Sequence, residues 1–106
     1  MERQSIKTYQ EFNEEKFTKR VIFNNGNSTA FVLNFLPGQT LPAHKHPGAE
    51  VYLLVVSGNG TIIIDGSESE VTETDLIHTG EDEELSFANT SNDRVSLYVV
   101  LNKLSK

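Results

Sequence analysis

The sequence GQTLPAHKHPGAEVYLLVVSG, which runs from Gly38 to Gly58, holds two of the three histidines of the chain. Successive side chains of a β-strand point to opposite faces of the sheet. His44 and His46 are therefore expected to share one face of a strand, while Lys45 points away from it. This stretch predicts two imidazoles that converge on one point.

Glu50 follows the turn residues Pro47 and Gly48 and opens the next apolar run. Its carboxylate is expected to return toward the imidazoles of His44 and His46. Two imidazoles and one carboxylate form a facial ligand set that leaves positions open on a divalent ion such as Fe, Mn, Ni or Zn. The alternative for an isolated His-x-His pair beside a proline is the end of a surface strand. The rest of the sequence is needed to choose between a metal site and the end of a surface strand.

Short runs of β-branched and aromatic residues alternate with turn residues along the chain, which predicts an all-β protein. The pairs Asn59-Gly60 and Asp65-Gly66 predict tight hairpin turns with positive φ. One helical turn is predicted between Glu11 and Lys16. The predicted strands cover residues 18–23, 28–36, 50–56, 61–64, 68–73, 76–78, 85–89 and 94–102, and the first two are expected to pair as a hairpin.

The spacing of residues 38–58 resembles the first motif of the cupin superfamily. That motif has Gly, five residues, His-x-His, three or four residues, Glu, six residues and a closing Gly. Gly38, His44, His46 and Glu50 match it in type and interval, and Gly58 comes one residue late, which predicts a bulge or a longer turn there. The resemblance implies a small single-domain cupin with a double-stranded β-helix or jelly-roll barrel, often dimeric. The domain would span residues 1–106, with the barrel core at about 28–101 and an N-terminal arm and edge strand at 1–27.

The second cupin motif is degraded in this chain. The family's fourth metal ligand falls on Leu85 when counted back from Asn89, and on Glu83 when counted forward from Gly80. Leucine cannot bind a metal, so the fourth position stays open. His78 is a candidate replacement if its strand faces the cavity, and otherwise a residue of the barrel rim.

Three more side chains are candidates for the pocket: Tyr52, Tyr98 and Asn89. A phenol hydroxyl that lines a pocket can act on a substrate, although a strand tyrosine is more simply a core residue. Asn89 has the alternative of hydrogen-bonding a turn. An apolar barrel lining is predicted from Phe31, Phe35 and Phe87.

The resemblance leaves two kinds of function open, because fold alone does not choose between them. One is a metal-dependent dioxygenase, isomerase or lyase that acts on a small molecule. The other is a non-catalytic barrel that binds or senses a small molecule, with or without a metal.

The amino-acid composition and charge restrict the kinds of partner that the chain is expected to have. The chain has 106 residues, of which 37% are hydrophobic and 23% charged, as in one globular domain. It has no cysteine, no apolar N-terminal run and no membrane-spanning segment, which favours the cytoplasm. The net charge is −6, and no Lys or Arg occurs between Lys45 and Arg94, which argues against nucleic acid. The run from Lys19 to Phe23 is expected to be an edge strand through which two copies form a homodimer.

Overall fold

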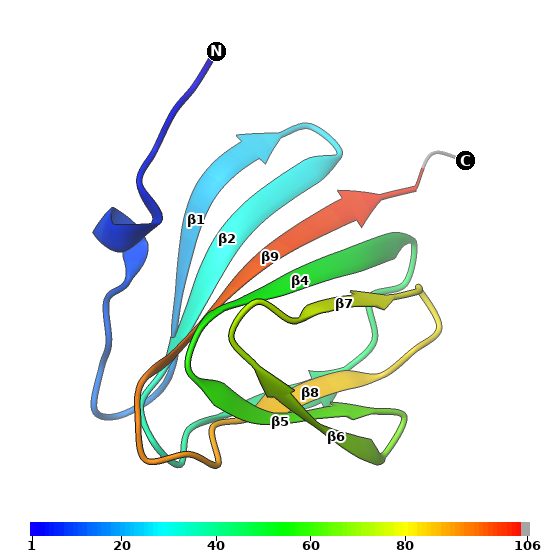
Figure 1. Cartoon of the computed structure of the whole chain (residues 1–106). Helices are drawn as coiled ribbons and strands as arrows, with labels where there is room; N and C mark the ends of the chain where they lie inside the picture. Colours follow the sequence, from blue (N-terminus) through cyan, green and yellow to red (C-terminus); the bar gives the residue numbers. More distant parts are fainter. Residues whose placement is uncertain (105–106) are drawn as a thin grey trace.

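Two antiparallel sheets face each other in this protein (Figure 1). The computed structural model describes residues 1–104. The larger sheet has five strands in the order β1-β2-β9-β4-β7, and the smaller has four in the order β3-β8-β5-β6. The prediction of an all-β protein is confirmed. The strands are β1 (Thr18–Asn25), β2 (Ser28–Phe35), β3 (Thr40–His44), β4 (Ala49–Ser57), β5 (Asn59–Ile64), β6 (Ser67–Thr72), β7 (Leu76–Thr79), β8 (Leu85–Ala88) and β9 (Val95–Lys103).

The core lies between the sheets because each strand alternates apolar and polar residues. On β4, Val51 and Leu53 point inward and are nearly fully buried, whereas Tyr52 between them is 47% exposed. The largest fully buried side chains are those of Phe35 and Phe87, whose ring centroids lie 5.0 Å apart. Burying each such side chain contributes about 2–3 kcal/mol to folding.

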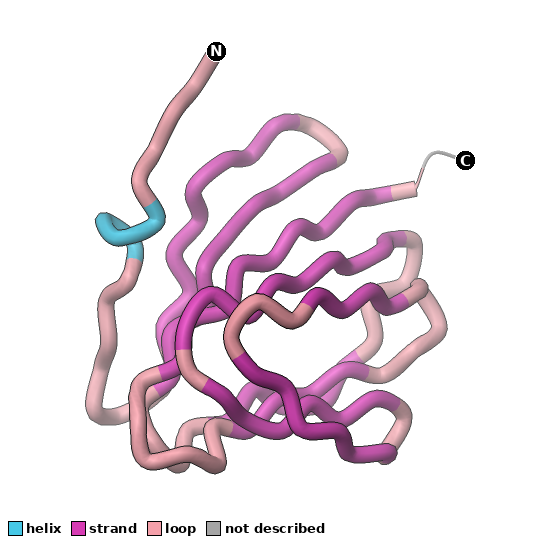
Figure 2. Tube along the Cα trace, in the orientation of Figure 1, coloured by secondary structure: helices cyan, strands magenta, loops and turns pink. Residues whose placement is uncertain are grey.

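The N-terminal arm covers part of the outer face of the larger sheet, and Figure 2 shows it running outside the strands with one helical turn. Asn34 of β2 and Ser96 of β9 are completely buried there although both are polar. The Asn34 amide donates a hydrogen bond of 2.8 Å to the carbonyl of Tyr9, and Ser96 Oγ donates one of 2.7 Å to Asn34 Oδ1. Gln10 Nε2 completes this group by donating to Ser96 Oγ at 3.2 Å. These bonds attach the arm to the barrel.

The helical turn was predicted in the wrong place. It is the 3-10 turn η1 (Ile6–Tyr9), and residues 11–16 are not helical. Asn13 Oδ1 accepts a hydrogen bond of 2.8 Å from the Glu15 amide, and the Asn13 carbonyl accepts one of 2.7 Å from Gln39 Nε2. The bond between Asn13 and Glu15 is a short-range side-chain bond, which competes with helix formation and explains the difference.

The predicted hairpin turn at Asn59-Gly60 is also wrong. Both residues belong to β5, which pairs with β6 and β8, whereas β4 pairs with β7 and β9. The chain passes from one sheet to the other at Gly58, which has a φ of 84°. The other predicted turn is confirmed, because Asp65 and Gly66 have φ of 52° and 81° and join β5 to β6.

Two expectations concern the borders of the larger sheet. The predicted hairpin of β1 and β2 is confirmed by their antiparallel register, and β1 is an edge strand of that sheet. Formation of a homodimer through this edge stays a prediction. No helix within residues 1–104 has the length and apolar character needed to cross a membrane.

Candidate functional site

A cavity of about 280 Å³ lies between the two sheets. Three of its lining side chains carry nitrogen: Lys19, His44 and His46. The others are apolar and come from strands of both sheets and from the end of the arm. They are Phe17, Phe31, Leu33, Leu41, Val51, Leu53, Leu85, Val99 and Leu101. The cavity is thus a mainly apolar chamber with a small group of polar side chains, of which Lys19 and His44 are exposed and His46 is partly buried.

The structure brings the two imidazoles of the His-x-His pair together. His44 ends β3 and His46 follows in the loop to β4, with ring centroids 4.4 Å apart. His44 Nδ1 lies 2.8 Å from the carbonyl oxygen of Pro42. Because a carbonyl only accepts, Nδ1 of His44 carries the proton, and in the neutral ring Nε2 keeps a free lone pair.

His46 sits in a more enclosed position than His44. Burial of its imidazole, followed by the positive charges of His44 and Lys19, holds the pKa of His46 below its ordinary value. The ring is therefore neutral at pH 7. Its Nδ1 atom is buried, and no atom of the described residues forms a hydrogen bond with it. A buried polar atom without a partner costs about 1–3 kcal/mol.

Lys19 brings a fixed positive charge to the same group. It lies on β1 opposite Leu33, and its Nζ is 4.5 Å from the centroid of the Phe31 ring. The ion pairs among residues 1–104 are Arg20 with Glu11 and His78 with Glu50, so Lys19 has no acidic partner there. No Asp or Glu lines the cavity. The polar part of the chamber is therefore positive.

Glu50 lies on the other face of the larger sheet. Its Oε1 accepts a hydrogen bond of 2.5 Å from His78 Nε2 and lies 3.5 Å from the Tyr52 hydroxyl. Tyr52 and His78 are opposite each other on β4 and β7, with ring centroids 4.9 Å apart. Because side chains alternate along β4, Val51 faces the cavity and Glu50 faces outward with Tyr52. The structure does not bring Glu50 to the two imidazoles.

The sequence contains a sign that Glu50 is displaced from the cavity, because the closing Gly58 comes one residue late relative to it. The register of β4 against β9 shifts between Val55 and Ser57, so the predicted irregularity near Gly58 is present. It lies after Glu50 and does not turn that residue inward. The motif has six residues between the carboxylate and the closing glycine, and three or four between the second histidine and the carboxylate. With six residues before Gly58 and four after His46, the carboxylate position falls on Val51. The inward position therefore carries a valine.

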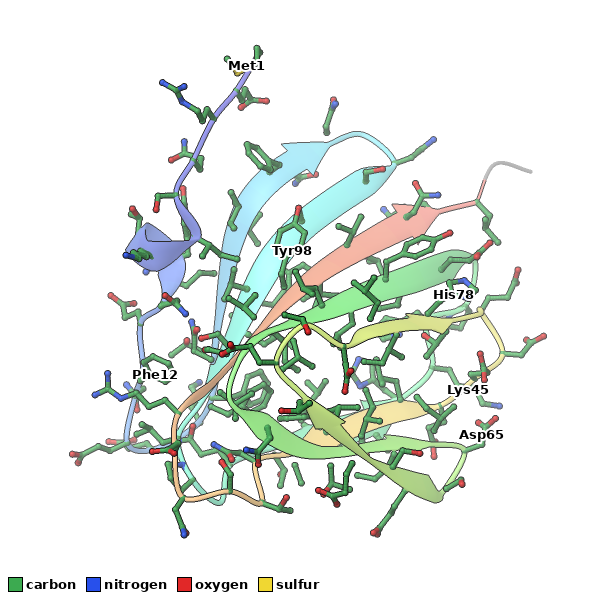
Figure 3. The ribbon with its side chains drawn as sticks, viewed as in Figure 1. Met1, Phe12, Lys45, Asp65, His78 and Tyr98 are labelled. Carbon is green, nitrogen blue, oxygen red and sulfur yellow. The ribbon has the colours of Figure 1, made fainter. Side chains whose placement is uncertain are left out.

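The other candidates for the pocket, Tyr98, Asn89 and His78, do not line the cavity. Tyr98 is on β9 between the buried Leu97 and Val99, so it points to the outer face. Figure 3 labels Tyr98 and, near β7, His78. Asn89 is buried in a turn, where its amide donates to the carbonyls of Phe35 and Asp93 and its oxygen accepts from Ser91. Glu83 accepts a hydrogen bond of 2.9 Å from the Gly80 amide. Leu85 does line the cavity.

The side chains present do not form a three-ligand metal site. Among the residues that the structure describes, no group of three His, Cys, Asp or Glu side chains is placed to hold a metal ion. Val51 and Leu85 supply hydrocarbon where the motif has a carboxylate and a histidine. The positive charge of Lys19 also opposes a divalent cation beside His46. The two imidazoles are the part of the predicted triad that the structure places together.

Lys19 is the site residue that the sequence did not reveal. Residues directly opposite in an antiparallel pair share a face, and Lys19 is opposite the inward Leu33. The register of β1 against β2 would have shown it. That register depends on a bulge between Val21 and Phe23, which the sequence pattern does not fix.

The comparisons with known proteins agree on the fold. Residues 31–101 match the family model described as "Cupin domain". A Thermus thermophilus protein of known structure is 21% identical, with a TM-score of 0.92 over 99% of this chain and 100% of that one. A Klebsiella pneumoniae protein with a double-stranded beta-helix domain is 17% identical, with a TM-score of 0.91 over 97% and 90%. A predicted oxalate decarboxylase from Thermotoga maritima is 18% identical, with a TM-score of 0.70 over 89% and 99%. No curated protein matches the chain.

Proposed function

This chain belongs to the cupin family, and from the contents of its barrel we propose that it binds a small molecule in the cavity between the sheets. The observation that carries the proposal is the lining, which is apolar on most sides and polar at Lys19, His44 and His46. Ligand pockets commonly combine an apolar wall with a few placed polar groups. A dry apolar cavity of about 150 Å³ is large enough for benzene. The space of about 280 Å³ suits a somewhat larger molecule.

Binding without turnover is favoured by what the lining contains. Nucleophilic catalysis needs a hydroxyl, thiol, amine or carboxylate activated by an adjacent base. The lining has no Ser, Thr, Cys, Tyr, Asp or Glu beside the imidazoles. Lys19 is the one amine, and its neighbours His46 and Phe31 supply no carboxylate. The proposed role is therefore that of a ligand-binding or sensing barrel.

A second candidate is a metal-assisted form of the same binding. It is favoured by His44, whose Nδ1–H is held by the Pro42 carbonyl while Nε2 is free, as in many metal-ligating histidines. His44 and His46 would then supply two ligands, and a divalent ion would add Lewis acidity at the site. Binding of phenylacetamide that needs added zinc would favour this second candidate, and equal binding with and without zinc would favour the first.

Filling the cavity is expected to abolish binding. Val51→Phe places a ring in the space between the sheets, whereas the control Leu76→Phe enlarges a side chain that is 79% exposed on β7. With the neutral probes phenylacetamide and octanamide, we expect Val51→Phe to weaken binding at least about tenfold, roughly 1.4 kcal/mol. Leu76→Phe should leave it within about twofold. Ligand-observed NMR titration measures both, and equal affinity in the two variants would place the probes outside the barrel.

A further inference from the structure

We propose that the natural ligand is a small apolar organic anion whose carboxylate, or a similar oxyanion, is held by Lys19 and His46. This rests on the proposed function and deepens it, since it names the chemical class that the chamber selects. The chain carries a net charge of −6, yet the charged side chain that lines its cavity is a lysine and no acid accompanies it.

The position of Lys19 suits an anion more than it suits a structural role. Lys19 is exposed, so it stands at the solvent-facing rim of the cavity, where its Nζ lies over the Phe31 ring at 4.5 Å. It forms no ion pair with the part of the chain that the structure describes. A charge-assisted hydrogen bond from an ammonium to a carboxylate is about twice as strong as a neutral one. An anionic ligand would therefore give this side chain the partner that it lacks.

His46 supplies the second contact. Its Nδ1 is enclosed by the protein, so Nε2 is the nitrogen that a ligand can reach, and in the tautomer with the proton on Nε2 the neutral ring donates there. A carboxylate oxygen of the ligand would accept a hydrogen bond from Nε2, and the charge of Lys19 would balance the charge of the ligand. His44 differs, because its Nδ1 proton is used by Pro42. Its Nε2 can accept a hydrogen bond from a water molecule or from a hydroxyl of the ligand.

The apolar side chains that line the cavity determine the chemistry of the rest of the ligand. Nine apolar side chains surround Lys19, His44 and His46, and they can contact an aliphatic chain or an aromatic ring of the ligand. Further polar atoms on the ligand would find no hydrogen-bond partner among them. Sugars and phosphorylated metabolites carry too many polar groups for such a lining. Short fatty acids and aryl-substituted carboxylic acids combine one anionic end with an apolar body. These are the acids that the chamber fits.

The test compares each acid with its neutral amide. Octanoate and phenylacetate are titrated beside octanamide and phenylacetamide, which keep the shape and remove the charge. In the unmodified protein we expect each acid to bind at least about tenfold more tightly than its amide. Lys19→Met should remove this preference by weakening the acids about tenfold while leaving the amides within about twofold. Lys19→Arg, which retains the charge, should keep the preference.

Lys45→Met is the matched control, because Lys45 stands between the two histidines in sequence but does not line the cavity. It should leave the affinities for the acids and amides unchanged. Acids and amides that bind equally well to the unmodified protein would overturn the anion proposal and leave the binding function standing. An equal loss of both in Lys19→Met would assign that residue a structural role and also overturn it. Absence of binding by all four probes would overturn both.

Discussion

Val51→Glu is expected to lower the free energy of unfolding by about 3–5 kcal/mol in metal-free buffer and to regain about 2–3 kcal/mol with zinc. The loss follows because Val51 is 2% exposed, so a carboxylate there would lose its hydration and replace an apolar contact of the core. The recovery follows because this side chain lines the same cavity as His44 and His46. It would complete the two-imidazole, one-carboxylate set that the motif describes. Urea unfolding with and without zinc measures both effects.

Two controls make the result specific. Val55→Glu places the same charge on the same strand at a residue that is completely buried but does not line the cavity. It should be destabilised by a similar amount and gain nothing from zinc. Glu50→Gln should respond to zinc as the unmodified protein does, since Glu50 faces outward beside His78. A zinc response that disappears in Glu50→Gln would show that Glu50 reaches the imidazoles, and would restore the triad predicted from sequence.

Gly60→Ala is expected to lower the free energy of unfolding by about 3 kcal/mol, near the upper end of the cost of overpacking a core. A Cβ atom there would lie 2.5 Å from Phe87 Cζ and 2.7 Å from the Ala88 carbonyl oxygen. The Phe87 ring cannot move away easily, because it is 1% exposed and packed against Phe35. Gly60 is therefore needed for the close approach of β5 to β8.

Gly66→Ala is the comparison, because Gly66 has a φ of 81° and no atom within 4 Å of the added Cβ. Gly66→Ala therefore introduces backbone strain alone, which costs about 1 kcal/mol. Urea denaturation of the two variants under one set of conditions gives the difference. If Gly60→Ala lost no more stability than Gly66→Ala, the packing account of Gly60 would be refuted.

Much of the fold was predictable because it depends on local alternation. The apolar run before Gly58 and the Asp65-Gly66 pair each fix a strand or a turn from a few neighbouring residues. The failures involve partners far apart in sequence. Asn59-Gly60 has the residues of a hairpin turn, but its strand β5 pairs with β6 and β8. A glycine is needed at position 60 because the Phe87 ring leaves no room for a Cβ atom. The strand expected to carry His44 was not given bounds from the sequence, because Pro42 interrupts β3 and most of its residues are exposed.

The site was predictable in part for the same reason. His44 and His46 lie together because they are two residues apart in the chain, and that spacing is visible in the sequence. Glu50 was expected on their side, but a carboxylate four residues after His46 falls on the opposite face of β4 from Val51. Lys19 reaches the cavity only through its pairing with Leu33. Both positions depend on strand register, which a count of residues does not determine.

The most direct test of the central claim is methyl NMR of the protein titrated with phenylacetate. Binding inside the barrel predicts shifts of the Leu and Val methyl signals that line the cavity, among them Leu33, Leu53 and Val99. Leu76, which is 79% exposed on the edge strand β7, should not shift. Saturating shifts confined to the cavity methyls are the result that this account predicts. Shifts at Leu76 with no change at Leu33, Leu53 and Val99 would contradict it.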